Sequence, residues 1–522
     1  MDFDHIIVGG GSAGAVLAAR LSENPNARVL LLEAGGKDNH PFFHLPAGFA
    51  KMTRGIGSWG WQTVPQRHMK DLVIRYTQAR VIGGGSSINA QIYTRGNALD
   101  YDEWRQMGCA GWGYEDVLPY FRKAEDNDTY ENRYHGKGGP MGVSQPRAPL
   151  PICDAYFAAA GQIGIPRNLD MTGEVQDGVG FYQLTQKNYR RSSTAVAYLR
   201  PARLRANLHV RTGAQVLRIL LENGRAVGVE LSDGAIRGGE VILSAGAIGS
   251  PRLLQLSGIG PADHLRAVGV PVVFDQPGVG ANLQDHLDLF VVAECTGPHT
   301  YDRFARPHLS ALALLHYLLT RRGPVASSLF ETGGFWYADP NARSPDIQLH
   351  LGLGSGIEAG VAALPQGGVT LNSAYLRPRS RGTVRLASDD PMAAPLIDPN
   401  YWADPYDRDM SIRGLKLARE IMRQDALKPY VLAERLPGPE VRTDADYFNY
   451  ACAHAKTDHH PAGTCRMGVD AAAVVDPDLR FNGIDGLRVV DASIMPSLIS
   501  SNTNAAAIMI AEKAADLIKG AR

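Results

Sequence analysis

Three glycines near the start of the chain have the spacing of a dinucleotide-binding turn. Gly9, Gly11 and Gly14 fit the pattern G-x-G-x-x-G. The first glycine permits a tight turn, the second lets backbone approach a pyrophosphate, and the third permits close packing of a helix on a strand. Glu33 follows about 20 residues later, where a carboxylate can accept hydrogen bonds from ribose hydroxyls. The pattern predicts a dinucleotide site, and by itself it does not separate FAD from NAD.

These glycines can bind a dinucleotide only if their neighbours form a βαβ unit. His5–Val8 is a short apolar strand, residues 15–21 favour a helix, and Arg28–Glu33 favours a second strand. Both strands are continuously apolar, as expected for a parallel sheet that is covered on both faces. The sequence therefore predicts a Rossmann-like unit at the start of the chain.

The rest of the chain alternates between two kinds of sequence pattern. Residues 241–256, 487–491 and 503–518 repeat the strand and helix pattern of the first unit, whereas Asp346–Leu351 and Gly382–Leu386 alternate as antiparallel strands do. We expect an α/β protein, α+β overall, with a Rossmann-like domain interleaved with a domain built on a mostly antiparallel sheet. The predicted boundaries are 1–150, 205–295 and 450–522 for the first domain, and 151–204 and 296–449 for the second.

Composition excludes several classes of protein. The 522 residues are too many for a single core, and Lys+Arg and Asp+Glu both total 53. Because basic and acidic residues balance, the chain has no excess positive charge that would favour nucleic acid, and no nucleic-acid partner is expected. The five cysteines are widely spaced without a C-x-x-C pair, so neither a disulfide framework nor a metal site is expected.

The chain also gives little sign of export or membrane insertion. It enters a strand directly after Met1, without a basic segment followed by an apolar one, so we expect a cytoplasmic protein. The longest apolar run, residues 309–319, is interrupted by Ser310, His316 and Tyr317 and is too short to span a bilayer. A peripheral contact with the inner membrane stays open.

Four further segments resemble the signatures of the glucose–methanol–choline (GMC) oxidoreductase family. They are Ala79–Asn89 with its continuation Tyr93–Gly96, Gly246–Gly260, His460–Gly468, and Asp491–Ser493 followed by Asn502–Asn504. The resemblance covers essentially the whole chain. Within the family, residues 46–53, 323–328 and 376–386 are most similar to bacterial FAD-dependent L-sorbose, alcohol and choline dehydrogenases.

The resemblance implies an FAD-binding domain with the flavin facing the substrate-binding domain. It implies that the following residues lie near FAD: Gly9, Gly11, Ser12, Ala13, Gly14, Glu33, Val81, Gly85, Asn89, Val216, Asp491, Ala492 and Asn504. Some members attach the flavin covalently through a histidine of the first signature. That position is Ile88 here, so non-covalent FAD is expected. The helix beginning near Asn504 would stabilise negative charge on reduced flavin.

Alcohol oxidation requires a group that removes the hydroxyl proton, and a neutral imidazole can do so. Periodicity does not choose among the 15 histidines. The resemblance assigns His460 as the catalytic base, with its neighbour His459 as the rival. It assigns Asn502 as the second polar residue at the catalytic centre. An amide can donate to the alcohol oxygen but cannot act as a base. Asn502 could also cap the last helix.

Residues on the substrate side are less well specified. Glu331 matches a substrate-side acid of choline-oxidising members, or it pairs with an arginine. Arg377 stands where those members carry a histidine, which puts recognition of a cationic substrate in doubt. Pocket lining or core packing is open for six aromatic residues: Trp59, Trp61, Phe330, Phe335, Trp336 and Tyr337.

The expected activity is hydride transfer from an alcohol to flavin N5. A sugar, polyol or primary alcohol is expected as substrate, with an L-sorbose-like compound favoured. The electrons would pass to a quinone or other carrier. The alternatives are an alcohol oxidase that uses O2 and an FAD-containing lyase of the hydroxynitrile type. The same residues would serve a dehydrogenase and an oxidase, so the sequence does not separate them.

Overall fold

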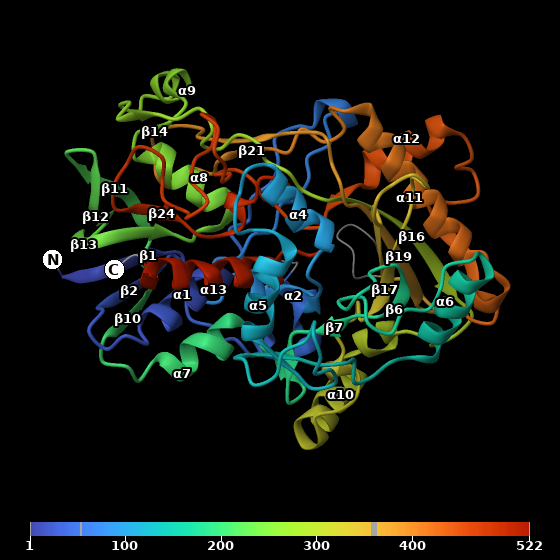
Figure 1. The fold of residues 1–522 in the computed structure, drawn as a ribbon. Helices are drawn as coiled ribbons and strands as arrows, with labels where there is room; N and C mark the ends of the chain where they lie inside the picture. Colours follow the sequence, from blue (N-terminus) through green and yellow to red (C-terminus); the bar gives the residue numbers. More distant parts are fainter. Residues whose placement is uncertain (1, 53–54, 356–362, 521–522) are drawn as a thin grey trace.

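The computed structural model describes residues 2–52, 55–355 and 363–520, and two sheets dominate it (Figure 1). The predicted βαβ unit is confirmed: β1 (Phe3–Val8) leads into α1 (Ser12–Leu21), which returns to β2 (Val29–Glu33). Every residue of β2 is buried, as are the last four of β1. This burial explains why both strands are apolar without alternation.

The first sheet has seven strands and mixed direction. β10 (Leu208–Thr212), β2, β1, β13 (Gly234–Leu243) and β24 (Leu487–Val489) run parallel to one another. The early part of β13 pairs antiparallel with β12 (Arg225–Leu231), which pairs with β11 (Val216–Glu222). The carboxyl ends of β1, β2 and β13 therefore meet at one edge, which is where open α/β sheets bind ligands.

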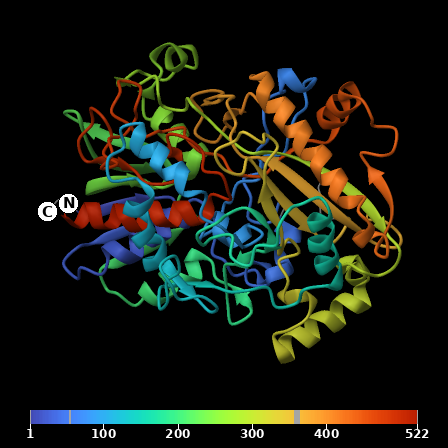
Figure 2. The same cartoon turned by 45° about the vertical axis from the view of Figure 1, so that its right-hand side comes forward.

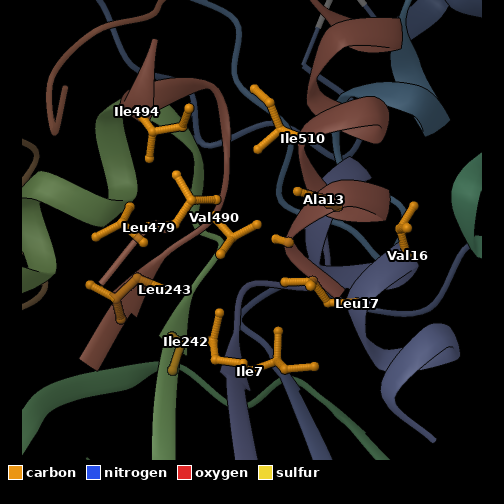
Figure 3. Close-up of a cluster of buried hydrophobic side chains, with 14 of the residues drawn as sticks. Ile7, Ala13, Val16, Leu17, Ile242, Leu243, Leu479, Val490, Ile494 and Ile510 are labelled. Carbon is orange, nitrogen blue, oxygen red and sulfur yellow. The ribbon is translucent and has the colours of Figure 1, made fainter. Parts of the chain in front are cut away.

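Two helices cover one face of this sheet. α1 and the last helix, α13 (Asn504–Gly520), pack against each other across β1. Figure 3 shows the core between them and the sheet, where Ile7 and Ile242 of the strands lie under Leu17 of α1 and Ile510 of α13. Because both helices begin at the same sheet edge, their N-termini are held side by side.

The second sheet is antiparallel throughout, as predicted. Its strand order is β22 (Val431–Leu436), β16 (Leu287–Cys295), β19 (Gly368–Tyr375), β18 (Ile347–Gly352), β17 (Thr332–Trp336) and β6 (Gly178–Phe181), and β23 (Lys456–Thr457) also pairs with β16. The long helix α11 (Pro405–Met422) packs across β16 and β19 (Figure 2). The buried faces of both form the second main core.

The domain boundaries stay a prediction, but sheet membership bears on them. β16 and β23 belong to the antiparallel sheet, although residues 205–295 and 450–522 were assigned to the Rossmann-like domain. We propose that these two strands belong to the substrate-binding domain.

Apart from the three-residue α7 (Arg200–Ala202), the other described α-helices connect or flank the two sheets. They are α2 (Phe49–Met52), α3 (Gly85–Ile88), α4 (Ala98–Gln106), α5 (Tyr114–Ala124), α6 (Pro151–Gln162), α8 (Gly246–Leu256), α9 (Ala262–Ala267), α10 (Pro307–Thr320) and α12 (Asp444–His454). The longest apolar run of the sequence forms α10. Among the described helices, none is long and apolar enough to cross a bilayer.

The packing of α1 on β1 predicts opposite effects for two glycine substitutions. A Cβ at Gly14 would lie 1.9 Å from the Gly9 carbonyl oxygen, whereas a Cβ at the exposed helical Gly161 meets nothing within 4 Å. Gly14→Ala should lower the free energy of unfolding by about 1–3 kcal/mol through overpacking. Gly161→Ala should raise it by about 0.5–1 kcal/mol, because alanine has less backbone entropy to lose. Urea denaturation measures both, and equal effects would contradict this packing.

Candidate active site

A cavity of ≈ 760 Å³ lies between the two sheets. Its walls include the carboxyl ends of β1, β2 and β13 on one side and residues of β16, β18 and β19 on the other. The following predicted site residues line it: Gly9, Gly11, Ser12, Ala13, Glu33, Gly85, Asn89, Val216, His460, Asp491, Ala492, Asn502 and Asn504. Residues far apart in the chain, from Gly9 to Asn504, thus meet around one space.

Two predicted cofactor residues do not line the cavity. Gly14 packs against the Gly9 backbone, as expected for the third glycine of the fingerprint. Val81 is buried in a small core with Phe43, Met52 and Ile88. Val81 therefore supports the cavity wall through packing instead of contributing to its surface.

The fingerprint glycines leave room for a ligand at the start of α1. Gly9 has a φ of 104°, and a Cβ there would lie 2.4 Å from the Ser244 carbonyl oxygen. A Cβ at Gly11 would meet nothing closer than 3.9 Å, so the space beside this glycine is open along the cavity wall. The unpaired N–H groups and positive dipole end of α1 point to this region. The turn fits a pyrophosphate.

A second helix N-terminus reaches the same cavity. The Ser12 hydroxyl at the start of α1 donates to Asn504 Oδ1 at the start of α13, at 2.7 Å. This bond connects residues 492 positions apart and fixes the two helix starts together. Two positive dipole ends therefore face one space, which suits a ligand that carries negative charge.

Glu33 ends β2 with its carboxylate held by the backbone. Oε2 accepts from the Gly10 N–H at 2.8 Å, and Oε1 accepts from the Gly35 N–H at 2.7 Å. Burial raises the pKa of Glu33, and these two hydrogen bonds partly oppose the rise. The fixed carboxylate retains lone pairs toward the cavity that ribose hydroxyls can use.

A buried arginine contacts Asn89, one of the residues that line the cavity. Arg191 donates from Nη1 to Asn89 Oδ1 at 2.7 Å and to the Ser86 carbonyl, and its Nε and Nη2 have no hydrogen-bond partner. Burial lowers its pKa to about 9. No ion pair joins it to a carboxylate of the described residues. A buried cation of this kind fits an anionic cofactor nearby.

The loop after β23 positions His460. The His460 backbone N–H donates to Asp285 Oδ1 at 2.8 Å, and Asp285 Oδ2 accepts from the hydroxyls of Tyr401 and Thr457 at 2.5 Å each. Burial raises the pKa of Asp285 to about 6. This carboxyl therefore ties the loop to the start of β16 and to a distant tyrosine.

A second histidine determines which nitrogen of His460 carries the proton. His286 Nε2 lies 3.1 Å from the Leu376 carbonyl oxygen, which only accepts, so that nitrogen is protonated. Burial lowers the pKa of His286 to about 3, which leaves it neutral with an unprotonated Nδ1. Because His460 Nδ1 lies 3.0 Å from His286 Nδ1, His460 must donate there. A neutral His460 then has a bare Nε2.

That bare nitrogen faces Asn502. Asn502 Nδ2 lies 3.1 Å from His460 Nε2 and donates to it. Asn502 Oδ1 accepts from the Thr94 hydroxyl at 3.0 Å and from Gln348 Nε2 at 2.9 Å, which orients the amide. Both polar atoms of the amide thus bind groups other than the first N–H groups of α13, so no hydrogen bond among the described residues supports the helix-cap interpretation of Asn502.

Several charges surround the imidazole. Burial lowers the pKa of His460 to about 4, and His350 and Lys456 act in the same direction, while Asp458 opposes them. Burial also lowers the pKa of His459 to about 4. Both imidazoles are neutral at pH 7. Of the two, only His460 has its free nitrogen fixed by His286 and Asn502.

The substrate-side expectations have mixed outcomes. Within the described part of the chain, Glu331 is not among the residues that line the cavity, and no arginine pairs with it. It accepts from Ser327 and from the Ser328 N–H, and burial raises its pKa to about 7. Arg377 forms an ion pair with Asp100 at 3.2 Å, outside the cavity lining. Neither expected contact of Glu331 is present among the described residues, because its Oε2 accepts from Ser327 and Ser328 in a local turn.

The six aromatic residues divide evenly. Trp59, Trp61 and Phe330 line the cavity, whereas Phe335, Trp336 and Tyr337 do not. Trp59 and Trp61 stack with ring centroids 4.9 Å apart, and Phe330 packs on Phe49 at 5.8 Å.

Sequence reasoning missed the residues that support His460. Asp285, His286 and Leu376 lie at least 84 positions before it, and His350 and Asn372 come from the second sheet. The only local signal was the polar pair Asp285-His286 at the start of an apolar strand. Nothing in that spacing points to His460.

Comparison with known proteins identifies the family. The N-terminal GMC oxidoreductase model matches residues 3–288 and the C-terminal model matches residues 378–511. The chain belongs to the GMC oxidoreductase family. It is an FAD-dependent oxidoreductase that acts on CH–OH donors.

Relatives with named activities extend over nearly the whole chain. Human mitochondrial choline dehydrogenase is 42% identical over 99% of this chain and 90% of its own length. Alcohol dehydrogenase [acceptor] from Pseudomonas putida is 40% identical over 99% of this chain and 95% of its own. The structure of pyridoxine 4-oxidase from Mesorbium loti has a TM-score of 0.90 at 33% identity and covers 99% of both chains.

The hydrogen bonds around His460 predict its spectroscopic behaviour. In holoenzyme labelled with ¹⁵N-histidine, the His460 signals, assigned by their loss in His460→Gln, should show a protonated Nδ1 and a bare Nε2. Because burial lowers the pKa of His460 to about 4, the ring should stay neutral as the pH falls from 8 to 5.

Two variants of His286 sharpen that measurement. His286→Leu removes the acceptor for Nδ1 and leaves only Asn502 to favour this tautomer, so the Nε2-protonated form should become populated, whereas His286→Asn retains an acceptor near the Nδ1 position and should preserve the parent tautomer. An Nε2-protonated His460 in the parent, or protonation above pH 6, would contradict the assignment.

Proposed function

We propose that this enzyme oxidises a neutral alcohol to an aldehyde or ketone, with His460 Nε2 as the base for the hydroxyl proton. The observation that carries the proposal is a pair of hydrogen bonds. His286 Nε2 lies 3.1 Å from the Leu376 carbonyl oxygen, and His286 Nδ1 lies 3.0 Å from His460 Nδ1, which leaves His460 Nε2 without a proton. That nitrogen lies in a cavity whose other half fits a dinucleotide. FAD bound there supplies the hydride acceptor, flavin N5.

His460 and Asn502 would act on the same hydroxyl. The alcohol inserts between them, donates its O–H to His460 Nε2, and accepts a hydrogen bond from Asn502 Nδ2. The 3.1 Å bond between the two side chains is thereby exchanged for two bonds to substrate. As the proton moves to Nε2, His286 accepts from the opposite nitrogen and stabilises the imidazolium. General-base help of this kind is typically worth about 10²–10⁴-fold in rate.

The cofactor-site assignments form part of the same proposal. The glycine turn and Glu33 would hold the adenosine diphosphate part of FAD, and the start of α13 at Asn504 would face the flavin. We propose non-covalent binding, because Ile88 offers no nucleophile at the position of the family's attachment histidine. The buried charge of Arg191 supports an anionic cofactor.

The substrate side of the cavity favours a neutral, polar alcohol. Asn372, His350 and Gln91 line it with hydrogen-bonding groups. Asp458 Oδ2 lies 3.8 Å from His460 Nδ1, and this carboxylate also interacts with Lys456 and His350. Lys456 already counters the charge of Asp458, and no further carboxylate of the described residues lines that side, so we favour a polyol or sugar over a quaternary ammonium. We favour an L-sorbose-like substrate, with primary alcohols as the alternative.

The electron acceptor is proposed from the relatives. The mitochondrial and Pseudomonas relatives are named dehydrogenases, whereas the Mesorbium loti relative is named an oxidase. We propose a dehydrogenase that passes electrons to a quinone or other carrier, in the cytoplasm and in peripheral contact with the membrane. An O2-dependent oxidase and a lyase of the hydroxynitrile type are the competing functions.

Anaerobic flavin reduction tests the proposal directly. In stopped flow, L-sorbose or another polyol should bleach the flavin of the parent enzyme, choline should do so poorly, and His460→Gln should slow the step about 10²–10⁴-fold. His459→Gln is the matched control, because this adjacent histidine also lines the cavity, and it should change the rate less than about tenfold.

Three results would overturn parts of this proposal. If no alcohol bleaches the parent flavin, a lyase is favoured. If His460→Gln reduces its flavin as fast as the parent, the base is elsewhere. If choline is the best substrate, the assignment of a neutral alcohol is wrong.

A further inference from the structure

Helix α10 presents an apolar surface to solvent. Leu312, Leu314, Leu315, Leu318 and Leu319 are 39–76% exposed, and only Ala313 and Tyr317 of the helix are buried. The helix projects from the lower edge of the molecule in both views (Figures 1 and 2). Exposed leucines occur singly on most surfaces, but a contiguous group of five marks an interaction site.

The helix is held mainly by its ends. It packs on the short 3₁₀ segments Tyr301–Ala305 and Pro324–Ala326 that precede and follow it. Tyr317 adds one anchor by donating its hydroxyl to the Tyr189 carbonyl at 2.7 Å. The opposite side carries Leu312, Leu315 and Leu319, which are three and four positions apart and so lie along one face. That face is left without a partner among the described residues.

Positive charge flanks both ends of this apolar face. Arg303 and Arg306 precede the helix, and Arg321 and Arg322 follow it. From Arg303 to Phe330 the chain contains no aspartate or glutamate. None of these four arginines forms an ion pair with a carboxylate of the described residues. An apolar stripe between clusters of arginines without carboxylate partners is complementary to a lipid surface, which has negatively charged headgroups above an apolar interior.

We propose that α10 docks the enzyme onto the surface of an anionic lipid bilayer. The helix has 14 residues and is about 21 Å long, whereas a bilayer core is about 30 Å thick, so it lies in the interface and does not span. Its leucines enter the acyl boundary while the arginines remain at headgroup level. A second copy of the chain is a poorer occupant. Either orientation of two α10 helices brings arginines opposite arginines.

The proposal concerns a surface outside the cavity and does not depend on the alcohol chemistry. It is nevertheless connected to the site by packing. Pro324–Ala326 packs on Pro46–Gly48, and these two segments lead to Phe330 and Phe49, which line the cavity. The docking helix and one cavity wall are therefore neighbours in the structure.

Co-sedimentation with vesicles tests the docking face. The full-length holoenzyme should bind vesicles of phosphatidylglycerol and phosphatidylcholine in equal parts, and bind pure phosphatidylcholine more weakly. Leu312→Glu/Leu315→Glu/Leu319→Glu should lower the partition coefficient at least about a hundredfold, since burial of each leucine is worth roughly tenfold or more. The control Leu169→Glu/Leu204→Glu/Val469→Glu changes equally exposed apolar residues elsewhere and should bind like the parent.

The arginines are tested separately. Replacing Arg303, Arg306, Arg321 and Arg322 by glutamine should weaken binding to the anionic vesicles about fivefold per residue and reduce its salt dependence, whereas lysine at the same positions should preserve both. The flavin absorbance spectrum and far-ultraviolet circular dichroism verify that every variant is folded.

Three outcomes would overturn the proposal. The first is a parent enzyme that does not bind anionic vesicles. The second is a control variant that loses as much binding as the α10 variant. The third is a parent that forms a dimer which the α10 variant disrupts, without vesicle binding by either. That last result would assign the face to a second copy.

Discussion

The hydrogen bond from His460 Nδ1 to His286 Nδ1 is the interaction on which the candidate active site depends. At 3.0 Å it selects one tautomer of a neutral imidazole and directs the other nitrogen into the cavity. The bond exists only because the Leu376 carbonyl, just after β19, fixes the proton of His286 on its far nitrogen. A carbonyl just after β19 thus determines which nitrogen of His460 is protonated, although His460 lies in the loop after β23.

The same burial that keeps the histidines neutral has a cost in stability. The pKa values of His286 and His460 are lowered to about 3 and 4, below the ordinary value of 6.5. The unfolded chain therefore binds protons at a higher pH than the folded chain does. Stability from these groups is fully present above pH 6.5 and is lost as the pH falls toward 4. The enzyme retains this arrangement because a neutral imidazole is what proton removal requires.

How much the sequence predicts depends on how local each feature is. The βαβ unit was predicted closely because Gly9, Gly14 and the buried β2 are neighbours with a known spacing. His460 was selected by family resemblance, since periodicity could not distinguish it. His286 lies 174 positions from His460, and no pattern in one sequence connects them. The orientation of Glu331 could not be predicted for the same reason: it depends on Ser327 and the local turn, which residue type alone does not reveal.

The pH dependence of flavin reduction tests the central claim most directly. In single-turnover reduction by a saturating alcohol, the rate should stay constant from pH 8 down to about 5 and fall only as His460 is protonated, near its lowered pKa of about 4. His286→Leu should shift that limb upward or lower the whole profile. The account would be contradicted if the rate already fell with an apparent pKa of 6.5 or higher and if His286→Leu left that pKa unchanged. Burial beside His286 would then determine neither the tautomer nor the pKa of the base.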